Sequence, residues 1–247
     1  MNNNTLCAVR RRAGIKWGRC KKLECRVTAV LVAAGSSTRM GFDKLSFDLG
    51  GETVLERSVR AFDECPEVDE LVIVTGASSE NAQRAAARCK KPVRLVRGGS
   101  TRAESARSGV AAAHGRLVAV HDAARPFVSQ SVIADTIAAA ARCGAAAPAV
   151  PVKDTIKTVA EDGAVTGTPD RSTLRAVQTP QVFETDLLKA ALQSALENEV
   201  PVTDDCSAVE RLGKVVYLID GDEENLKITT PVDLVIAEAI LAEREGR

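Results

Sequence analysis

Short apolar runs, each followed by a segment with helical periodicity, constrain the fold of this 247-residue chain more than any other feature. A run without polar alternation is typical of a strand that is covered on both faces, as in a parallel sheet. The candidate strands are residues 27–34, 71–75, 93–96, 117–120, 145–152 and 215–219. The candidate helices are at about 52–64, 79–90, 102–114, 129–142, 185–197, 203–212 and 231–244. Strands that alternate with helices are joined by right-handed crossovers, so the pattern predicts a doubly wound α/β domain with a mostly parallel sheet.

One segment departs from this alternation. Residues 151–159 read Pro-Val-Lys-Asp-Thr-Ile-Lys-Thr-Val with the period of a strand, and the turn-forming Glu161-Asp162-Gly163 separates them from residues 164–168. The pattern predicts a β-hairpin arm at about 151–170, inserted in the α/β fold. Because a two-stranded hairpin is only marginally stable alone, we expect the arm to pack on another body, such as the second subunit of a homodimer.

The overall composition is that of a globular protein and excludes several functional classes. Hydrophobic residues make up 45% of the chain and charged residues 27%, and the 33 basic residues balance the 33 acidic ones. A neutral chain is not expected to bind nucleic acid, and an aromatic content of 3% leaves little to stack on bases. No run of about 18 uncharged apolar residues occurs, so the sequence predicts no membrane span.

Residues 1–26 form a basic segment that differs from the rest of the chain. They hold eight Lys or Arg residues and one acid, Glu24, which leaves 25 bases and 32 acids in residues 27–247. The segment lacks the apolar core that secretory signals need, and it lacks Ser, in which transit peptides are rich. We expect a disordered extension or residues upstream of the functional start, with an organelle-targeting segment as the alternative, and a functional domain at 27–247.

Seven Cys residues are scattered along the chain without a Cys-x-x-Cys pair, and only two His residues occur. That pattern indicates neither a disulfide framework nor a zinc site. Several of the Cys residues lie in or beside predicted helices and strands, where a free thiol behaves as a small buried hydrophobe. The sequence therefore predicts a reducing, cytoplasmic compartment.

The segment after the first predicted strand combines small residues with two cations. Ala33-Ala34-Gly35 is followed by Arg39 and Lys44, and ligands of open α/β sheets bind at the carboxyl ends of strands. Small residues let backbone N–H groups approach a phosphate, and the cations would neutralise its charge. The segment matches neither the Walker A loop nor the dinucleotide-binding Gly-x-Gly-x-x-Gly pattern. We predict an anion site, with a plain turn as the alternative.

A second candidate segment, residues 97–105, places a pair of glycines before a predicted helix. It is either a turn in which Ser100 caps the helix, or a loop whose N–H groups and Ser105 bind a ligand.

A third candidate segment, residues 120–127, follows the fourth predicted strand. Asp122 ends that strand, and an acid beside an anion site is well placed to hold Mg²⁺ through its oxygens. The alternative is an ion pair between Asp122 and Arg125 across a turn. His121 has no evident partner in the sequence, so we expect it to be structural rather than catalytic.

Taken in order, these segments resemble a known family. The loop from Ala33 to Leu45 is similar to the signature loop of the sugar-phosphate nucleotidyltransferases. Residues 179–183, 203–208 and 225–229 complete the pattern, although each alone could be a turn or a helix cap. Over residues 27 to about 244 the chain resembles the 2-C-methyl-D-erythritol 4-phosphate cytidylyltransferases of the non-mevalonate isoprenoid pathway. The resemblance implies a Rossmann-like nucleotidyltransferase fold, use of CTP, dependence on Mg²⁺ or another divalent cation, and a homodimer.

The resemblance also implies roles for individual residues. The catalytic residues would be Arg39, Lys44, Arg171 and Lys227. The residues that contact CTP would be Ala33, Ala34, Gly35, Gly99, Ser105, Asp122 and Ala123. The residues that hold the sugar phosphate would be Thr155, Arg171, Thr179, Thr203 and Lys227, of which Thr155 and Arg171 come from the arm of the partner subunit. The metal ligands would be Asp122 and Glu224.

In two places the sequence departs from the family pattern. The loop between Arg39 and Lys44 is shorter than in some members, which leaves the placement of Lys44 open. Three acids, Asp222, Glu223 and Glu224, lie just before the Asn-x-Lys segment, where one metal-binding acid is expected. Glu224 is our choice among them.

The implied reaction is transfer of CMP from CTP to 2-C-methyl-D-erythritol 4-phosphate, which releases pyrophosphate and forms 4-diphosphocytidyl-2-C-methyl-D-erythritol. A phosphate monoester is already an ionised nucleophile, so alignment and charge neutralisation are the expected catalytic contributions. Three alternatives stay open at this point: a ribitol 5-phosphate cytidylyltransferase, a guanylyltransferase that acts on a cofactor precursor, and a catalytically inactive nucleotide-binding regulator.

Overall fold

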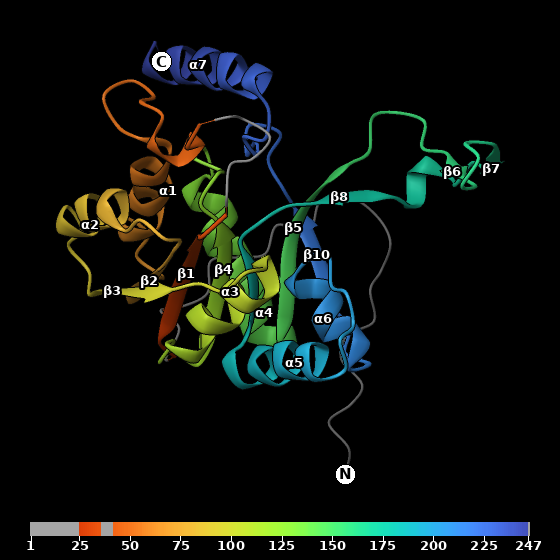
Figure 1. The fold of residues 1–247 in the computed structure, drawn as a ribbon, viewed down its shortest axis with the longest axis horizontal. Coiled ribbons are helices and arrows are strands. Elements are labelled where there is room, and N and C mark those ends of the chain that lie inside the picture. Colours follow the sequence, from red (N-terminus) through yellow and green to blue (C-terminus); the bar gives the residue numbers. More distant parts are fainter. Residues whose placement is uncertain (1–24, 36–41, 247) are drawn as a thin grey trace.

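A computed structural model describes residues 25–35 and 42–246 of the chain. They form one main β-sheet with helices on both faces, and a small hairpin extends from one side of it (Figure 1). The strands that run parallel to one another are β1 (Val27–Ala33), β2 (Glu70–Thr75), β3 (Val93–Arg97), β4 (Leu117–Asp122), β5 (Ala145–Pro151) and β10 (Tyr217–Asp220). The antiparallel strands are β8 (Arg175–Val177) and β9 (Gln181–Glu184). The predicted doubly wound, mostly parallel α/β fold is confirmed.

The order of strands in the sheet is β10-β5-β9-β4-β1-β2-β3. From β1 the chain proceeds outward through β2 and β3, and it then returns to the other side of β1 to add β4. Such a reversal leaves a crevice between the loops that follow the two central strands, and ligands bind in crevices of this kind. The carboxyl ends of β1 and β4 are therefore the place where this fold offers a site.

Helices cover both faces because the central strands are apolar on both sides. On β1, Ala29 and Leu31 pack into the core on one face, while Val30 packs into the core on the other. The helices of the first face are α1 (Val54–Asp63), α2 (Glu80–Ala87), α4 (Gln130–Cys143) and α7 (Pro231–Glu245). The helices of the second face are α3 (Arg102–Ala111), α5 (Thr185–Glu197) and α6 (Asp205–Arg211).

Helix α3 lies unusually close to the sheet. A Cβ atom at Gly109 would lie 2.4 Å from Val30 Cγ1 and 2.6 Å from Val74 Cγ2, so the contact requires a glycine. The helix begins after Thr101, whose hydroxyl accepts the N–H of Glu104. The predicted cap at Ser100 is therefore wrong by one residue. The cap fixes the direction of the first helical side chain, which points toward the crevice.

The structure differs from the prediction in two regions. Strands β8 and β9 were not predicted, because they are too short and too polar to form an apolar run. In the arm, only β6 (Thr158–Val159) and β7 (Val165–Gly167) pair with each other. The strand predicted over 151–159 is thus wrong over most of its length, although the hairpin itself is present and projects away from the sheet (Figure 1).

Within residues 25–35 and 42–246, no helix is both long and apolar enough to cross a membrane. The predicted basic extension, residues 1–26, lies almost entirely outside the described residues and stays a prediction.

Candidate active site

A cavity of about 760 Å³ opens at the carboxyl ends of β1 and β4. One side is the end of β1 together with Lys44, and a second side is the segment 97–101 with the first turn of α3. The end of β4 and the segment around Lys227 form the third side. Residues that are far apart in sequence therefore meet at the crevice that the strand order creates.

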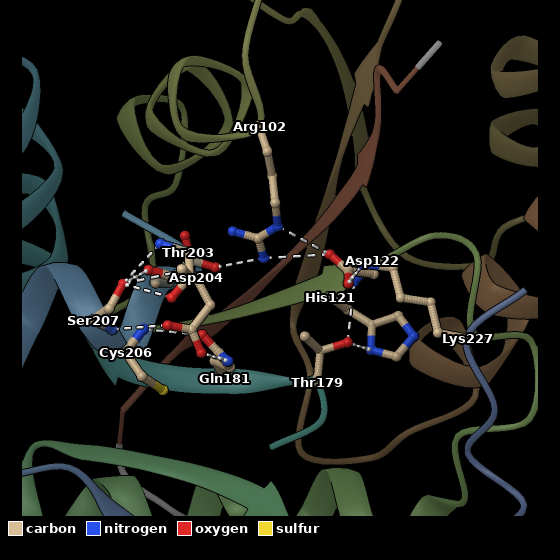
Figure 2. A network of polar contacts seen from close by, with 11 residues as sticks. Arg102, His121, Asp122, Thr179, Gln181, Thr203, Asp204, Cys206, Ser207 and Lys227 are labelled. Atoms are coloured by element: carbon tan, nitrogen blue, oxygen red, sulfur yellow. Dashed lines mark hydrogen bonds and ion pairs between the residues drawn. The ribbon is translucent and has the colours of Figure 1, made fainter. Parts of the chain in front are cut away.

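Asp122 is the centre of an ion-pair network on the cavity wall (Figure 2). Its Oδ2 lies 2.7 Å from Lys227 Nζ, and its Oδ1 lies 3.2 Å from Arg102 Nη2. Burial alone would raise the pKa of Asp122, but the two cations more than offset this effect and hold the pKa well below its usual range. The carboxylate is therefore ionised. The predicted alternative, an ion pair with Arg125, is wrong, because the Arg125 guanidinium donates to the Asn225 carbonyl instead.

The segment that carries Lys227 is held to the rest of the site from two sides. Lys44 Nζ donates to the Ile228 carbonyl at 2.8 Å, and the Ile228 N–H donates to the Ala124 carbonyl at 2.9 Å. The buried Asn225 donates from Nδ2 to the Thr179 carbonyl at 2.9 Å. These bonds bring the Lys44 and Lys227 side chains to the same cavity.

Thr179 and His121 support Asp122 from behind. The Thr179 hydroxyl accepts the Asp122 N–H at 3.1 Å and lies 3.0 Å from His121 Nδ1, to which it can donate. His121 Nε2 lies 3.2 Å from the Arg125 carbonyl, which can only accept, so the proton of the neutral ring belongs on Nε2. Burial lowers the pKa of His121 to about 4, and its ring packs on Phe62. The structural role that we expected for His121 fits this environment.

Most of the small residues expected to contact a nucleotide do line the cavity. Ala34, Gly35 and Gly99 lie on its surface, as does Ser105, whose hydroxyl donates to the Thr101 carbonyl at 2.8 Å. Ala33 lines an adjoining pocket, which shares Ala34 and Gly35 with the cavity.

Ala123 does not fit the predicted role. Its side chain is fully buried, its N–H donates to the Val32 carbonyl, and its carbonyl accepts from the Ser58 hydroxyl. The neighbouring Ala124 lines the cavity instead. Arg39 lies outside the described residues, so its predicted role stays a prediction.

Comparisons with known proteins agree with one another. The family model described as "IspD: 2-C-methyl-D-erythritol 4-phosphate cytidylyltransferase" matches residues 27–243. The chain belongs to this family. A curated 2-C-methyl-D-erythritol 4-phosphate cytidylyltransferase of Symbiobacterium thermophilum is 46% identical over 225 residues, which cover 90% of this chain and 95% of the relative.

Solved structures give the same result. The 4-diphosphocytidyl-2C-methyl-D-erythritol synthase of Anaerococcus prevotii superposes with a TM-score of 0.80 at 32% identity, covering 88% of this chain and 96% of that one. The 2-C-methyl-D-erythritol 4-phosphate cytidylyltransferase of Thermus thermophilus superposes with a TM-score of 0.73 at 35% identity, covering 86% and 98%.

Some residues that the cytidylyltransferase resemblance implied do not line the cavity of this chain. Thr179 is only 3% exposed, and its hydroxyl is engaged by Asp122 and His121, so it braces the site rather than facing a ligand. Thr203 lies in the loop before α6, within 3.4 Å of the Ser207 hydroxyl, and does not line the cavity.

None of the three candidate acids before the Asn-x-Lys segment reaches the cavity. Glu224 pairs with Arg244 of α7 at 2.8 Å, and Glu223 pairs with Lys153. The Asp222 carboxylate accepts the Glu224 N–H. Glu224 therefore does not line the cavity in this arrangement, and its role as a second metal ligand stays a prediction. Asp122 is the acid among these four that lines the cavity. Among the described residues, no cluster of three or more His, Cys, Asp or Glu side chains could hold a metal.

Thr155 and Arg171 lie on the exposed arm, outside the cavity of their own chain. Arg171 Nη1 donates to the Lys153 carbonyl at 2.6 Å, which fixes the base of the arm.

Sequence reasoning missed Arg102 and Asp205. Arg102 lines the cavity and bridges two carboxylates, Asp122 and Asp205. Both residues lie inside candidate segments, at the first positions of α3 and α6. An acid such as Asp205 is ordinary in the first turn of a helix, so its sequence position does not mark it as part of a site. Their pairing depends on how α3 and α6 pack and has no signature in sequence spacing.

Proposed function

We propose that this chain transfers CMP from CTP to 2-C-methyl-D-erythritol 4-phosphate, releasing pyrophosphate and forming 4-diphosphocytidyl-2-C-methyl-D-erythritol. The observation that carries the proposal is the meeting of Lys44, Lys227 and the ionised Asp122 in one cavity at the switch point of the sheet. Membership of the cytidylyltransferase family over residues 27–243 supplies the substrates.

The nucleotide is assigned to the side of the cavity formed by small residues. The backbone of Ala33, Ala34 and Gly35 offers close approach to phosphate oxygens, and Gly99 with Ser105 offers a polar edge to a pyrimidine. At Gly98, a Cβ atom would lie 2.6 Å from both Ala34 Cβ and Ser105 Oγ, so the two sides of the cavity already approach closely there.

Charge neutralisation is the main chemical task of the site. Oxygen of the sugar phosphate attacks the α-phosphorus of CTP, and the bond to pyrophosphate breaks. Both reactants are anions, so their approach is unfavourable unless cations offset the repulsion. Lys44, together with Arg39, is assigned to the triphosphate and the developing negative charge. Lys227 is assigned to the attacking phosphate, which it would hold in line with the α-phosphorus.

One acidic side chain of the cavity, Asp122, fits a divalent cation. Mg²⁺ usually binds through one or two carboxylates together with the phosphates of a substrate. Asp122 supplies one ionised carboxylate inside the cavity, and Glu224 supplies none because it faces Arg244. A cation held by Asp122 and the nucleotide would neutralise phosphate charge.

We assign Thr155 and Arg171 to the site of a second subunit. The arm that carries them projects away from the body of its own chain (Figure 1). Its apolar side chains Val159 and Val165 are 60% and 61% exposed, which favours their burial against another copy of the chain. A homodimer would add one cation, Arg171, to each cavity.

A pyrophosphate-release assay tests the proposed function. The purified protein is incubated with CTP and either 2-C-methyl-D-erythritol 4-phosphate or ribitol 5-phosphate, with and without Mg²⁺, and GTP replaces CTP in a parallel series. Release that needs CTP, Mg²⁺ and the methylerythritol phosphate is the expected result. Preference for ribitol 5-phosphate or GTP would contradict the assigned substrates, and CTP binding without release would indicate a regulator.

A further inference from the structure

Arg102 is shared between two carboxylates. Its Nη2 lies 2.9 Å from Asp205 Oδ2 and 3.2 Å from Asp122 Oδ1, and its Nε also lies 3.2 Å from Asp122 Oδ1. Figure 2 shows the guanidinium between Asp122 at the end of β4 and the segment that begins α6. Asp122 in turn holds Lys227, so the charges alternate from the interior to the cavity: Asp205, Arg102, Asp122, Lys227.

Burial of the Asp205 carboxylate is unfavourable for the free energy of folding. Its side chain is 1% exposed, Arg102 is its ion-pair partner, and among residues 25–35 and 42–246 no group donates a hydrogen bond to its Oδ1. Taking a carboxylate out of water costs several kcal/mol unless its lone pairs are satisfied, and exchanging such a group for a neutral one of similar shape is often tolerated. Burial also raises the pKa of Asp205, which is the direction expected for an incompletely satisfied acid. Folding stability alone therefore does not explain this carboxylate.

Asp205 is itself rigidly placed. It is the first residue of α6, and the preceding Asp204 caps the helix by accepting the N–H of Ser207 at 2.9 Å. The buried Gln181 of β9 donates to Asp204 at 2.7 Å and accepts the N–H of Cys206 at 3.0 Å. A carboxylate fixed in this way can determine where a flexible arginine side chain lies.

The position of Arg102 matters because its side chain is 30% exposed and lines the cavity to which we assign the anionic substrates. Without Asp205, the guanidinium would be free to turn toward a bound phosphate and to leave Asp122. Asp122 would then keep one cation instead of two, and the orientation of its carboxylate, on which Lys227 rests, would be lost.

We propose that Asp205 is a positioning residue, which holds Arg102 on Asp122 and so keeps Asp122 and Lys227 aligned for the transfer reaction. This inference rests on the proposed function. Asp205 does not contact Asp122 itself, so its effect on Asp122 is transmitted through Arg102.

A double-mutant cycle tests the proposal in the full-length protein. Asp205→Asn keeps the shape and removes the charge, Arg102→Gln removes the guanidinium, and the third variant combines both. The kcat and KM for CTP and for 2-C-methyl-D-erythritol 4-phosphate are measured with Mg²⁺, and Tm is measured on the same samples. Glu210→Gln, an exposed acid on α6, and Arg107→Gln, an exposed arginine on α3, are the matched controls.

We expect Asp205→Asn to lower kcat/KM roughly 10–100-fold, the range typical of groups that hold a metal-ligating side chain in place. The Tm should be unchanged or raised, because a buried charge is removed. In the Arg102→Gln background the same substitution should change kcat/KM less than twofold. If Arg102→Gln does not fold by circular dichroism, Arg102→Lys, which keeps the charge but lacks the planar fork of the guanidinium, takes its place in the cycle.

Three results would overturn the inference: wild-type kcat/KM in Asp205→Asn, an equal loss in both backgrounds, or a loss accompanied by a fall in Tm of more than about 5 °C. Absence of turnover in the unmodified protein would instead contradict the proposed function, so the two failures are distinguishable.

Discussion

Lys227 Nζ lies 2.7 Å from Asp122 Oδ2, although the two residues are 105 positions apart in the chain. The contact joins the end of β4 to the segment after β10, and it places a cation and an acid side by side on the cavity wall. In the proposed reaction the ammonium holds the attacking phosphate, and Asp122 keeps it in place until the substrate arrives.

Replacing Lys227 by Met removes the charge and keeps the length of the side chain. We expect turnover to fall about 10²–10³-fold, because the attacking phosphate loses a positioned cation. Lys214→Met, at an exposed lysine outside the cavity, should behave like the unmodified protein. Turnover of Lys227→Met within twofold of that control would remove Lys227 from the mechanism.

Lys44→Ala should lower turnover by a similar factor, because the developing charge on the triphosphate loses a donor. The fold should survive, since Lys44 lies in the short 3₁₀ turn Lys44–Ser46 at the edge of the cavity. Circular dichroism checks the fold and pyrophosphate release checks turnover. Arg39→Ala is expected to give a comparable loss, and Lys90→Ala, an exposed lysine, serves as the control. Normal activity in Lys44→Ala would show that the triphosphate binds elsewhere.

Gly109→Ala should destabilise the protein by about 1–3 kcal/mol, as expected for overpacking of a core. The added methyl would enter the contact with Val30 and Val74, which are fully buried in the sheet and cannot move aside. Alanine favours a helix by about 1 kcal/mol over glycine, which reduces the loss but does not reverse it. Urea unfolding measures the change, and Arg107→Ala on the exposed side of α3 should be nearly neutral. A more stable Gly109→Ala variant would mean that α3 does not lie this close to the sheet.

His121 should make folding stability depend on pH. Its pKa is lowered from 6.5 to about 4 by burial, so the unfolded chain takes up a proton between these values while the folded protein does not. The contribution to stability is therefore present above about pH 6.5 and is lost as the pH falls toward 4.

Urea midpoints at pH 7.5 and pH 5 measure this dependence. His121→Gln should show a smaller difference between the two pH values than the unmodified protein. An equal difference in the two proteins would show that His121 is not buried as a neutral ring.

The sequence predicted the parallel core well because burial on both faces leaves an unmistakable pattern. Leu71–Thr75 and Leu117–Val120 have no polar alternation, and they form β2 and β4. The antiparallel strand β9 has only four residues, with Gln181 and Glu184 at its ends, so nothing in its pattern marks a strand between β4 and β5.

The sequence pointed to cavity-lining residues where a side chain follows a strand, and it missed those whose position depends on packing between helices. Asp122 and Lys44 lie beside strand ends and could be selected from their position. The bridge from Arg102 to Asp205 forms because α3 and α6 lie on the same face of the sheet. The family resemblance implied a metal-binding acid just before the Asn-x-Lys segment, where Glu224 lies, but this side chain pairs with Arg244 on α7.

A crystal structure with CTP and Mg²⁺ bound is the most direct test of the account. We predict that the triphosphate lies against Lys44 and Arg39, with cytosine beside Gly99 and Ser105 and the α-phosphorus facing Lys227. Nucleotide bound outside this cavity, with Lys44 and Lys227 both remote from its phosphates, would contradict the central claim.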